Sequence, residues 1–192
     1  MSGFDNDILG DRRRALEDQF FADQDKKLLD KMRKEFHALE EKKKLTHVSG
    51  IVEEKVLGDL MSVGVRAETL AAVRLIPMIE TAWSDGSITA EERREILKIA
   101  HENEMKIGTA AYDLLEKWLE RRPLGQVFES WKEYVVELHK VMPRESFQKL
   151  RDQALERCRA VAGASGGFMG LGRISNAEAD KIDEIVRALS GY

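Results

Sequence analysis

The stretch WSDGSITAEE, residues 83–92, holds the residue types that come nearest to recognisable chemistry. Its Asp-Gly-x-Ile core, followed by a glutamate, is typical of the middle of a calcium-binding loop. With Gly86 at the sixth position of such a loop, Asp85 stands at position five and Glu92 at position twelve, where oxygen ligands belong. Positions one and three hold a threonine and a tryptophan instead of carboxylate or amide side chains. The sequence therefore does not predict a regular EF-hand.

A looser cation site stays open at the same place. The candidate ligands are Asp85, Glu91 and Glu92, with Glu80 one turn earlier and Glu95 one turn later. Such a carboxylate cluster, together with waters, suits a hard divalent cation such as calcium or magnesium. The alternative is an acidic first helical turn that the helix dipole stabilises. The residue pattern favours the alternative, and no other cofactor is expected.

The same stretch has a second copy further along the chain. Placing Gly86 on Gly172 gives an offset of 172 − 86 = 86 residues and matches six positions. The shared pattern is Gly-x-Ile-Ser/Thr-x-x-Glu followed by isoleucines on one helical face. The matched pairs are Gly86 and Gly172, Ile88 and Ile174, Thr89 and Ser175, Glu92 and Glu178, Ile96 and Ile182, and Ile99 and Ile185.

Each part of this pattern has a structural reason. Glycine permits the positive backbone angle of a tight turn, and the isoleucine after it is expected to anchor in the core. Ser/Thr-x-x-Glu is a capping box, in which the hydroxyl accepts from the amide three residues later and the glutamate carboxylate accepts from the cap residue's own amide. The second copy lacks the other ligand oxygens, so the duplicated feature is interpreted as a helix-start device.

The elements that position these residues are all expected to be helices, because apolar residues recur mostly at three- and four-residue steps. The fold class is all-α, a compact bundle of about seven or eight helices. Pro77 is expected to kink or break the third helix, which should be the central, buried one. The expected helices span residues 11–44, 51–63, 67–83, 89–103, 109–121, 127–141, 145–161 and 175–189.

The chain is expected to contain two parts, a charged amphipathic N-terminal helix in residues 1–48 and a helical domain in residues 49–192. The first helix carries a narrow apolar stripe, with a break expected near residues 23–25. That stripe suits packing on the rest of the chain, which is the favoured interpretation, or pairing with a partner helix, including one from a second copy.

Residues 82–97, AWSDGSITAEERREIL, resemble the signature of the TerB-like tellurite-resistance domain family. The resemblance covers residues 67–119, implies a bundle of helices in a bacterial cytoplasmic protein, and links acidic residues at this turn with divalent-cation binding. Asp85, Glu91 and Glu92 match that acidic set, whereas the second copy has Leu171-Gly172 in place of Asp-Gly. The first 25 residues are also similar to the start of a bacterial ATP synthase inhibitor family.

Composition and missing motifs argue against several functions. A net charge of −4 is unlike the broad basic surface of a nucleic-acid-binding protein. One cysteine, no signal peptide and no apolar run of about 18 residues indicate a cytoplasmic protein. The four histidines form no zinc motif, and the glycine-rich segment 163–172 lacks a nucleotide fingerprint. An enzyme is not expected.

Two functions are consistent with these observations. The first is a non-catalytic TerB-like protein-interaction module in a bacterial stress-response or envelope-associated system, with an unidentified protein partner. The alternative is a divalent-cation-binding protein that uses the carboxylates around Asp85.

Overall fold

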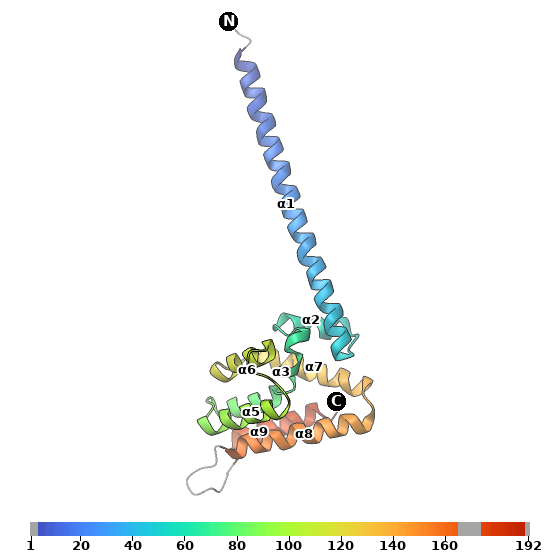
Figure 1. The fold of residues 1–192 in the computed structure, drawn as a ribbon, viewed down its shortest axis with the longest axis vertical. Helices are drawn as coiled ribbons and strands as arrows, with labels where there is room; N and C mark the ends of the chain where they lie inside the picture. Colours follow the sequence, from blue (N-terminus) through green and yellow to red (C-terminus); the bar gives the residue numbers. More distant parts are fainter. Residues whose placement is uncertain (1–3, 165–173, 191–192) are drawn as a thin grey trace. The chain divides into compact units, whose positions relative to one another are not determined.

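The computed structural model describes residues 4–164 and 174–190, and in these ranges all regular structure is helical (Figure 1). The described residues form nine α-helices and two short 3-10 segments, η1 and η2. The bounds are α1 Phe4–Ser49, α2 Glu54–Ser62, η1 Ala67–Thr69, α3 Leu70–Val73, α4 Ile76–Ala82, η2 Trp83–Asp85, α5 Ala90–Glu102, α6 Ala110–Glu120, α7 Gly125–Val141, α8 Arg144–Ala164 and α9 Asn176–Ala188. The all-α prediction is confirmed. Most of the glycine-rich segment, from residue 165, lies outside the described ranges.

The chain divides into two compact units, residues 1–41 and 42–192. Helix α1 passes through this division without the break expected near residues 23–25, which contain neither glycine nor proline. The end of this helix expected at residue 44 is also wrong, because the helix continues to Ser49. Leu45 in this last part of the helix is fully buried. The Gly50 amide donates to the Thr46 carbonyl at 2.9 Å, and Gly50, with φ of 72°, ends the helix.

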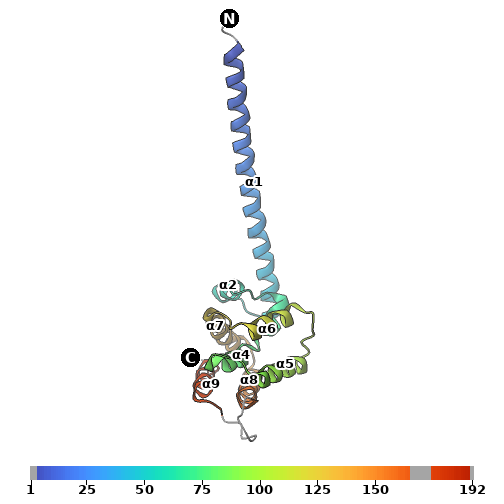
Figure 2. The same cartoon turned by 90° about the vertical axis from the view of Figure 1, so that its left-hand side faces the viewer.

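Helix α4 forms the centre of the second unit, as the sequence predicts. All seven of its residues, from Ile76 to Ala82, are buried. It packs against α7, α8, α9 and α5, and Figure 2 shows α4 beside α8 and α9 in a second view. A helix that is covered on every side needs apolar residues around its full circumference, which explains why this segment lacks a polar face.

Pro77 breaks the third expected helix in two, which raises the helix count above the expected eight. Helix α3 ends at Val73, and Pro77 stands in the first turn of α4. A proline is tolerated there because the first backbone amides of a helix have no partner inside it. The Pro77 carbonyl in turn accepts from Thr81 Oγ1 at 2.8 Å.

Both copies of the capping box form as predicted. Thr89 Oγ1 accepts from the Glu92 amide at 3.2 Å, and Glu92 Oε2 accepts from the Thr89 amide at 2.7 Å. Ser175 Oγ accepts from the Glu178 amide at 3.2 Å, and Glu178 Oε2 accepts from the Ser175 amide at 2.6 Å. These bonds occupy amides that the starts of α5 and α9 would otherwise leave unpaired.

The isoleucines of the repeated motif behave less uniformly. The pairs on the helix faces, Ile96 and Ile99 in α5 and Ile182 and Ile185 in α9, are buried as expected. Ile88 is partly buried against the core, but Ile174 is exposed. The prediction that the isoleucine after the glycine anchors in the core is therefore wrong for Ile174 in the second copy. The element that the two copies share is the capping box.

Removal of either cap hydroxyl tests this account. We expect Thr89→Ala and Ser175→Ala each to lower the free energy of unfolding by about 1 kcal/mol, because each leaves a helix amide without its acceptor. Urea unfolding followed by circular dichroism measures the change. Ser87→Ala is the matched control, since Ser87 is exposed one residue from the same turn. Cap variants as stable as this control would contradict the account.

Candidate functional site

The turn that carries Asp85 is a tight reversal between α4 and α5. Asp85 ends η2, and Gly86 follows with φ of 100°, a conformation that other residues adopt at a steric cost. Asp85 is exposed, and its Oδ1 accepts from the Ser87 amide at 3.1 Å. One carboxylate oxygen of Asp85 thus stabilises the turn, while the side chain remains in contact with solvent.

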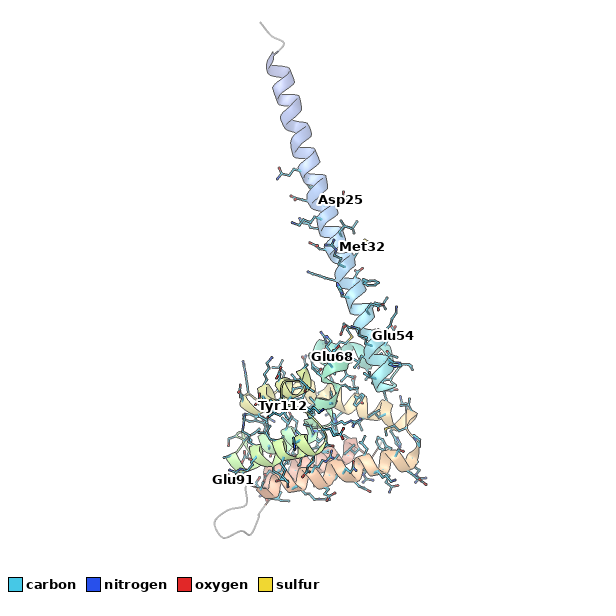
Figure 3. All side chains as sticks on the ribbon, viewed as in Figure 1. Asp25, Met32, Glu54, Glu68, Glu91 and Tyr112 are labelled. Carbon is cyan, nitrogen blue, oxygen red and sulfur yellow. The ribbon has the colours of Figure 1, made fainter. Side chains whose placement is uncertain are left out.

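Glu91 and Glu92 differ in environment although they are neighbours in the chain. Glu91 is exposed at the start of α5, where Figure 3 labels it. Glu92 is only 1% exposed, and its Oε2 accepts from both the Thr89 amide and the Thr89 hydroxyl, at 2.7 and 2.8 Å. Adjacent positions of a helix do not face each other. The structure therefore places Glu92 inside the bundle and Glu91 outside it.

The buried carboxylate of Glu92 lies near two other acidic residues. Burial raises the pKa of Glu92, the hydrogen bonds from Thr89 lower it, and the negative charges of Glu178 and Asp85 raise it further. Glu178 is 2% exposed, and its Oε1 has no hydrogen-bond partner among the described residues. The two capping glutamates of the duplicated motif thus lie close enough to interact.

The sequence pairs Glu178 with Glu92 as equivalent residues of two copies, but it does not place them near each other. Helix α9 packs against both η2 and α8, and α8 packs against α5. This arrangement brings the starts of α5 and α9 together. The capping box that both copies share is the signal in the sequence that gives Glu92 and Glu178 the same local role. Their proximity depends on tertiary packing, which the sequence pattern does not show.

Glu80 is a third buried carboxylate, on the central helix α4. It is 3% exposed; Arg122 Nη2 lies 3.5 Å from its Oε2, and its Oε1 has no partner among the described residues. Burial raises the pKa of Glu80, and the Arg122 charge opposes that shift. A single long contact compensates only part of the cost of burying a carboxylate.

Cys158, on α8, is the single cysteine of the chain, and its side chain is fully buried. Burial raises its pKa to about 12, although a hydrogen bond with Thr81 acts in the opposite direction. The thiol is therefore protonated at neutral pH, whereas a nucleophile or metal ligand needs the thiolate.

Within residues 4–164 and 174–190, histidine, cysteine, aspartate and glutamate side chains form no group of three or more that is arranged to hold a metal ion. In the same ranges, no helix is long and apolar enough to cross a membrane. The chain matches no protein-family model, no curated protein and no solved structure.

The buried carboxylate of Glu80 predicts a pH dependence of stability. Its folded pKa is raised above the unfolded value, so its ionisation destabilises the fold as pH rises through the interval between the two values. Below both values the carboxyl is neutral in both states and this cost is absent. The Glu80→Gln variant has no carboxyl to ionise at this position. The difference in unfolding free energy, variant minus wild type, should therefore be larger at pH 7.5 than at pH 4.5.

Urea unfolding at the two pH values measures this difference. Glu120→Gln is the control, since Glu120 is an exposed glutamate with no ion pair among the described residues. A relative stability of Glu80→Gln that stays constant with pH, or that rises towards pH 4.5, would contradict the assignment.

Proposed function

We propose that this chain is a non-catalytic, TerB-like helical protein of the bacterial cytoplasm that acts as a protein-interaction module. The observation that carries the proposal is the apolar surface of α1. Six large apolar side chains between residues 20 and 39 are 50–61% exposed. They are Phe20, Leu28, Leu29, Met32, Phe36 and Leu39.

Helix α1 needs cover from another element, because residues 4–41 are one helix and contain no second element of their own. Most helical stability in proteins comes from packing of an apolar face rather than from intrinsic propensity. Exposed apolar side chains that follow one another along a surface are typical of binding sites. Figure 3 labels Met32 among the side chains that project from α1.

The spacing of the stripe indicates what kind of partner it suits. Leu29, Met32, Phe36 and Leu39 are separated by three, four and three residues. This alternation is the one that brings a helix side by side with another helix, with apolar side chains interleaved. The partner is therefore a helix, either from a second copy of the chain or from another protein.

The resemblance of residues 82–97 to the TerB-like family supports a role in a stress-response or envelope-associated assembly. The acidic turn and its capping box, which carry that resemblance, are formed in the structure. The composition and the net charge of −4 support a protein partner rather than a nucleic acid.

A charge placed within the stripe tests the interaction. We expect Phe36→Glu to abolish pairing of α1 with another helix, because a buried charge opposes such pairing. If the partner is a second copy, light scattering should show the loss of self-association. If it is another protein, capture from native lysate should show the loss of its enrichment. A chain that lacks residues 1–41 but keeps the buried Leu45 should behave in the same way. Lys34→Glu is the matched control, since it introduces the same residue at an exposed polar position of α1.

The competing arrangement is packing of the stripe on the chain's own second unit. In that case Phe36→Glu would lower the melting temperature of the purified monomer and leave association unchanged. This result, or the absence of any association that Phe36→Glu removes and Lys34→Glu retains, would contradict the proposal.

A second candidate function is divalent-cation binding near Asp85. It is favoured by the unpartnered Oε1 of the buried Glu178 and by the proximity of Asp85 and Glu178 to Glu92. A divalent cation would offset the repulsion between these carboxylates. Glu91 is exposed and would contribute only from outside the bundle.

Thermal melting with calcium, magnesium or zinc against a chelator tests cation binding. A bound cation should raise stability by about 2.7 kcal/mol at a concentration of 100 times its dissociation constant. Asp85→Ala should remove the rise, and Asp152→Ala, at an exposed aspartate of α8, should retain it. No saturable rise with any of the three cations would eliminate this candidate.

A further inference from the structure

A cavity of about 690 Å³ lies in the second unit, away from the acidic turn. Its walls come mainly from α7 and α8, with contributions from α3, the start of α4 and the end of α1. Cavities of roughly 300–1,000 Å³ are the usual size of small-molecule sites. No residue of the acidic turn, of the two capping boxes or of the apolar stripe of α1 lines this cavity.

Most of the cavity wall is apolar, including side chains that remain in contact with solvent. Trp131, Tyr134 and Leu138 form part of the wall from α7, and Val141 and Val48 are half exposed at its edge. Apolar side chains exposed around a hollow favour a ligand with a hydrocarbon part.

The charged side chains that line the cavity are all cations. They are Arg74, Lys149 and Arg157, and no aspartate or glutamate accompanies them in the lining. Arg157 Nη2 donates to Asn103 Oδ1 at 2.7 Å, whereas Arg74 and Lys149 form no ion pair with the rest of the described chain. In a protein of net charge −4, this lining selects for an anionic group on the ligand.

Tyr134 supplies a further polar group to the wall. Its side chain is 7% exposed, and its hydroxyl has no hydrogen-bond partner within the described residues. The Arg74 charge acts on this hydroxyl: burial raises the pKa of Tyr134 and Arg74 lowers it. Tyr134 and Arg74 line the same cavity, and neither has a hydrogen-bond or ion-pair partner for its side chain among the described residues, so both offer donors to an anion bound there.

We propose that this cavity binds a single-chain fatty acid, with its carboxylate held by Arg74, Lys149 and the Tyr134 hydroxyl and its acyl chain along Leu138 and Val141. Size favours a free fatty acid over a membrane phospholipid as the source of this chemistry. A liquid occupies about 30 Å³ per water-sized group, so the cavity admits on the order of twenty non-hydrogen atoms. One acyl chain with its carboxylate fits that space, and two chains with a headgroup do not.

Binding is measured with dodecanoate below its micelle concentration, by titration calorimetry of the full chain. We expect saturable binding of one dodecanoate per chain. Dodecyltrimethylammonium, which has the same chain length and the opposite charge, should bind at least tenfold more weakly, and acetate, which has no chain, should not bind.

Variants assign the site to the cavity. The double variant Arg74→Gln and Lys149→Gln should weaken dodecanoate binding at least tenfold, because charge-assisted hydrogen bonds contribute more than neutral ones. Tyr134→Phe, which removes only the hydroxyl, should weaken it severalfold. The matched control is Arg94→Gln on α5, where an exposed arginine lies outside the cavity lining.

Three outcomes would overturn the proposal. The first is no saturable binding of dodecanoate, and the second is equal binding by the double variant and the Arg94→Gln control. The third is binding to phosphatidylglycerol vesicles but not to dodecanoate, which would identify a membrane surface as the ligand. Unfolding of each variant is followed in parallel, so that only folded variants are compared.

Discussion

Two buried carboxylates at helix starts are the constraint on which the bundle of the second unit depends. Glu92 and Glu178 each accept hydrogen bonds from a cap residue, and these bonds fix where α5 and α9 begin. Both helices pack on α4 and α8, so their register determines the burial of the isoleucines that face the core. Burying two like charges near each other is unfavourable, and the cap hydrogen bonds offset part of that cost. The motif that resembles a metal loop therefore has a structural role in both copies. Among the described residues, the buried Oε1 of Glu178 has no hydrogen-bond partner.

The surfaces available for binding are formed by other residues than these caps, and they differ in chemistry. The apolar stripe of α1 suits another helix, since its side chains follow the alternating spacing of helix pairs. The cavity lined mainly by α7 and α8 has a mostly apolar wall and three cations, of which Arg74 and Lys149 form no ion pair among the described residues. This lining suits a small amphiphilic anion. All seven residues of the central helix α4 are buried, and one long contact to Arg122 compensates part of the cost of burying Glu80. Stability, partner binding and ligand binding thus depend on separate sets of residues.

The sequence predicts local structure well where the signal is local. The capping boxes, the glycine turn at Gly86 and the break at Pro77 each depend on a few adjacent residues, and all three are present. The sequence predicts the end of α1 too early, at residue 44 and not at Ser49, because the burial of Leu45 depends on residues distant in sequence. The proximity of Glu92 to Glu178 and the cation-lined cavity arise from the packing of helices that are far apart in the chain. No periodicity or motif encodes such packing.

The central claim is that the apolar stripe of α1 is buried against a partner helix. Amide hydrogen exchange of residues 20–39 in the full chain tests this claim most directly. An uncovered helix opens easily, so its amides exchange rapidly, whereas a paired helix is protected. The account predicts fast exchange in the dilute purified chain and protection that increases with protein concentration or with the captured partner, and that Phe36→Glu removes. Strong protection in the dilute monomer, independent of concentration and of any partner, would show that the stripe is covered by its own chain and would contradict the account.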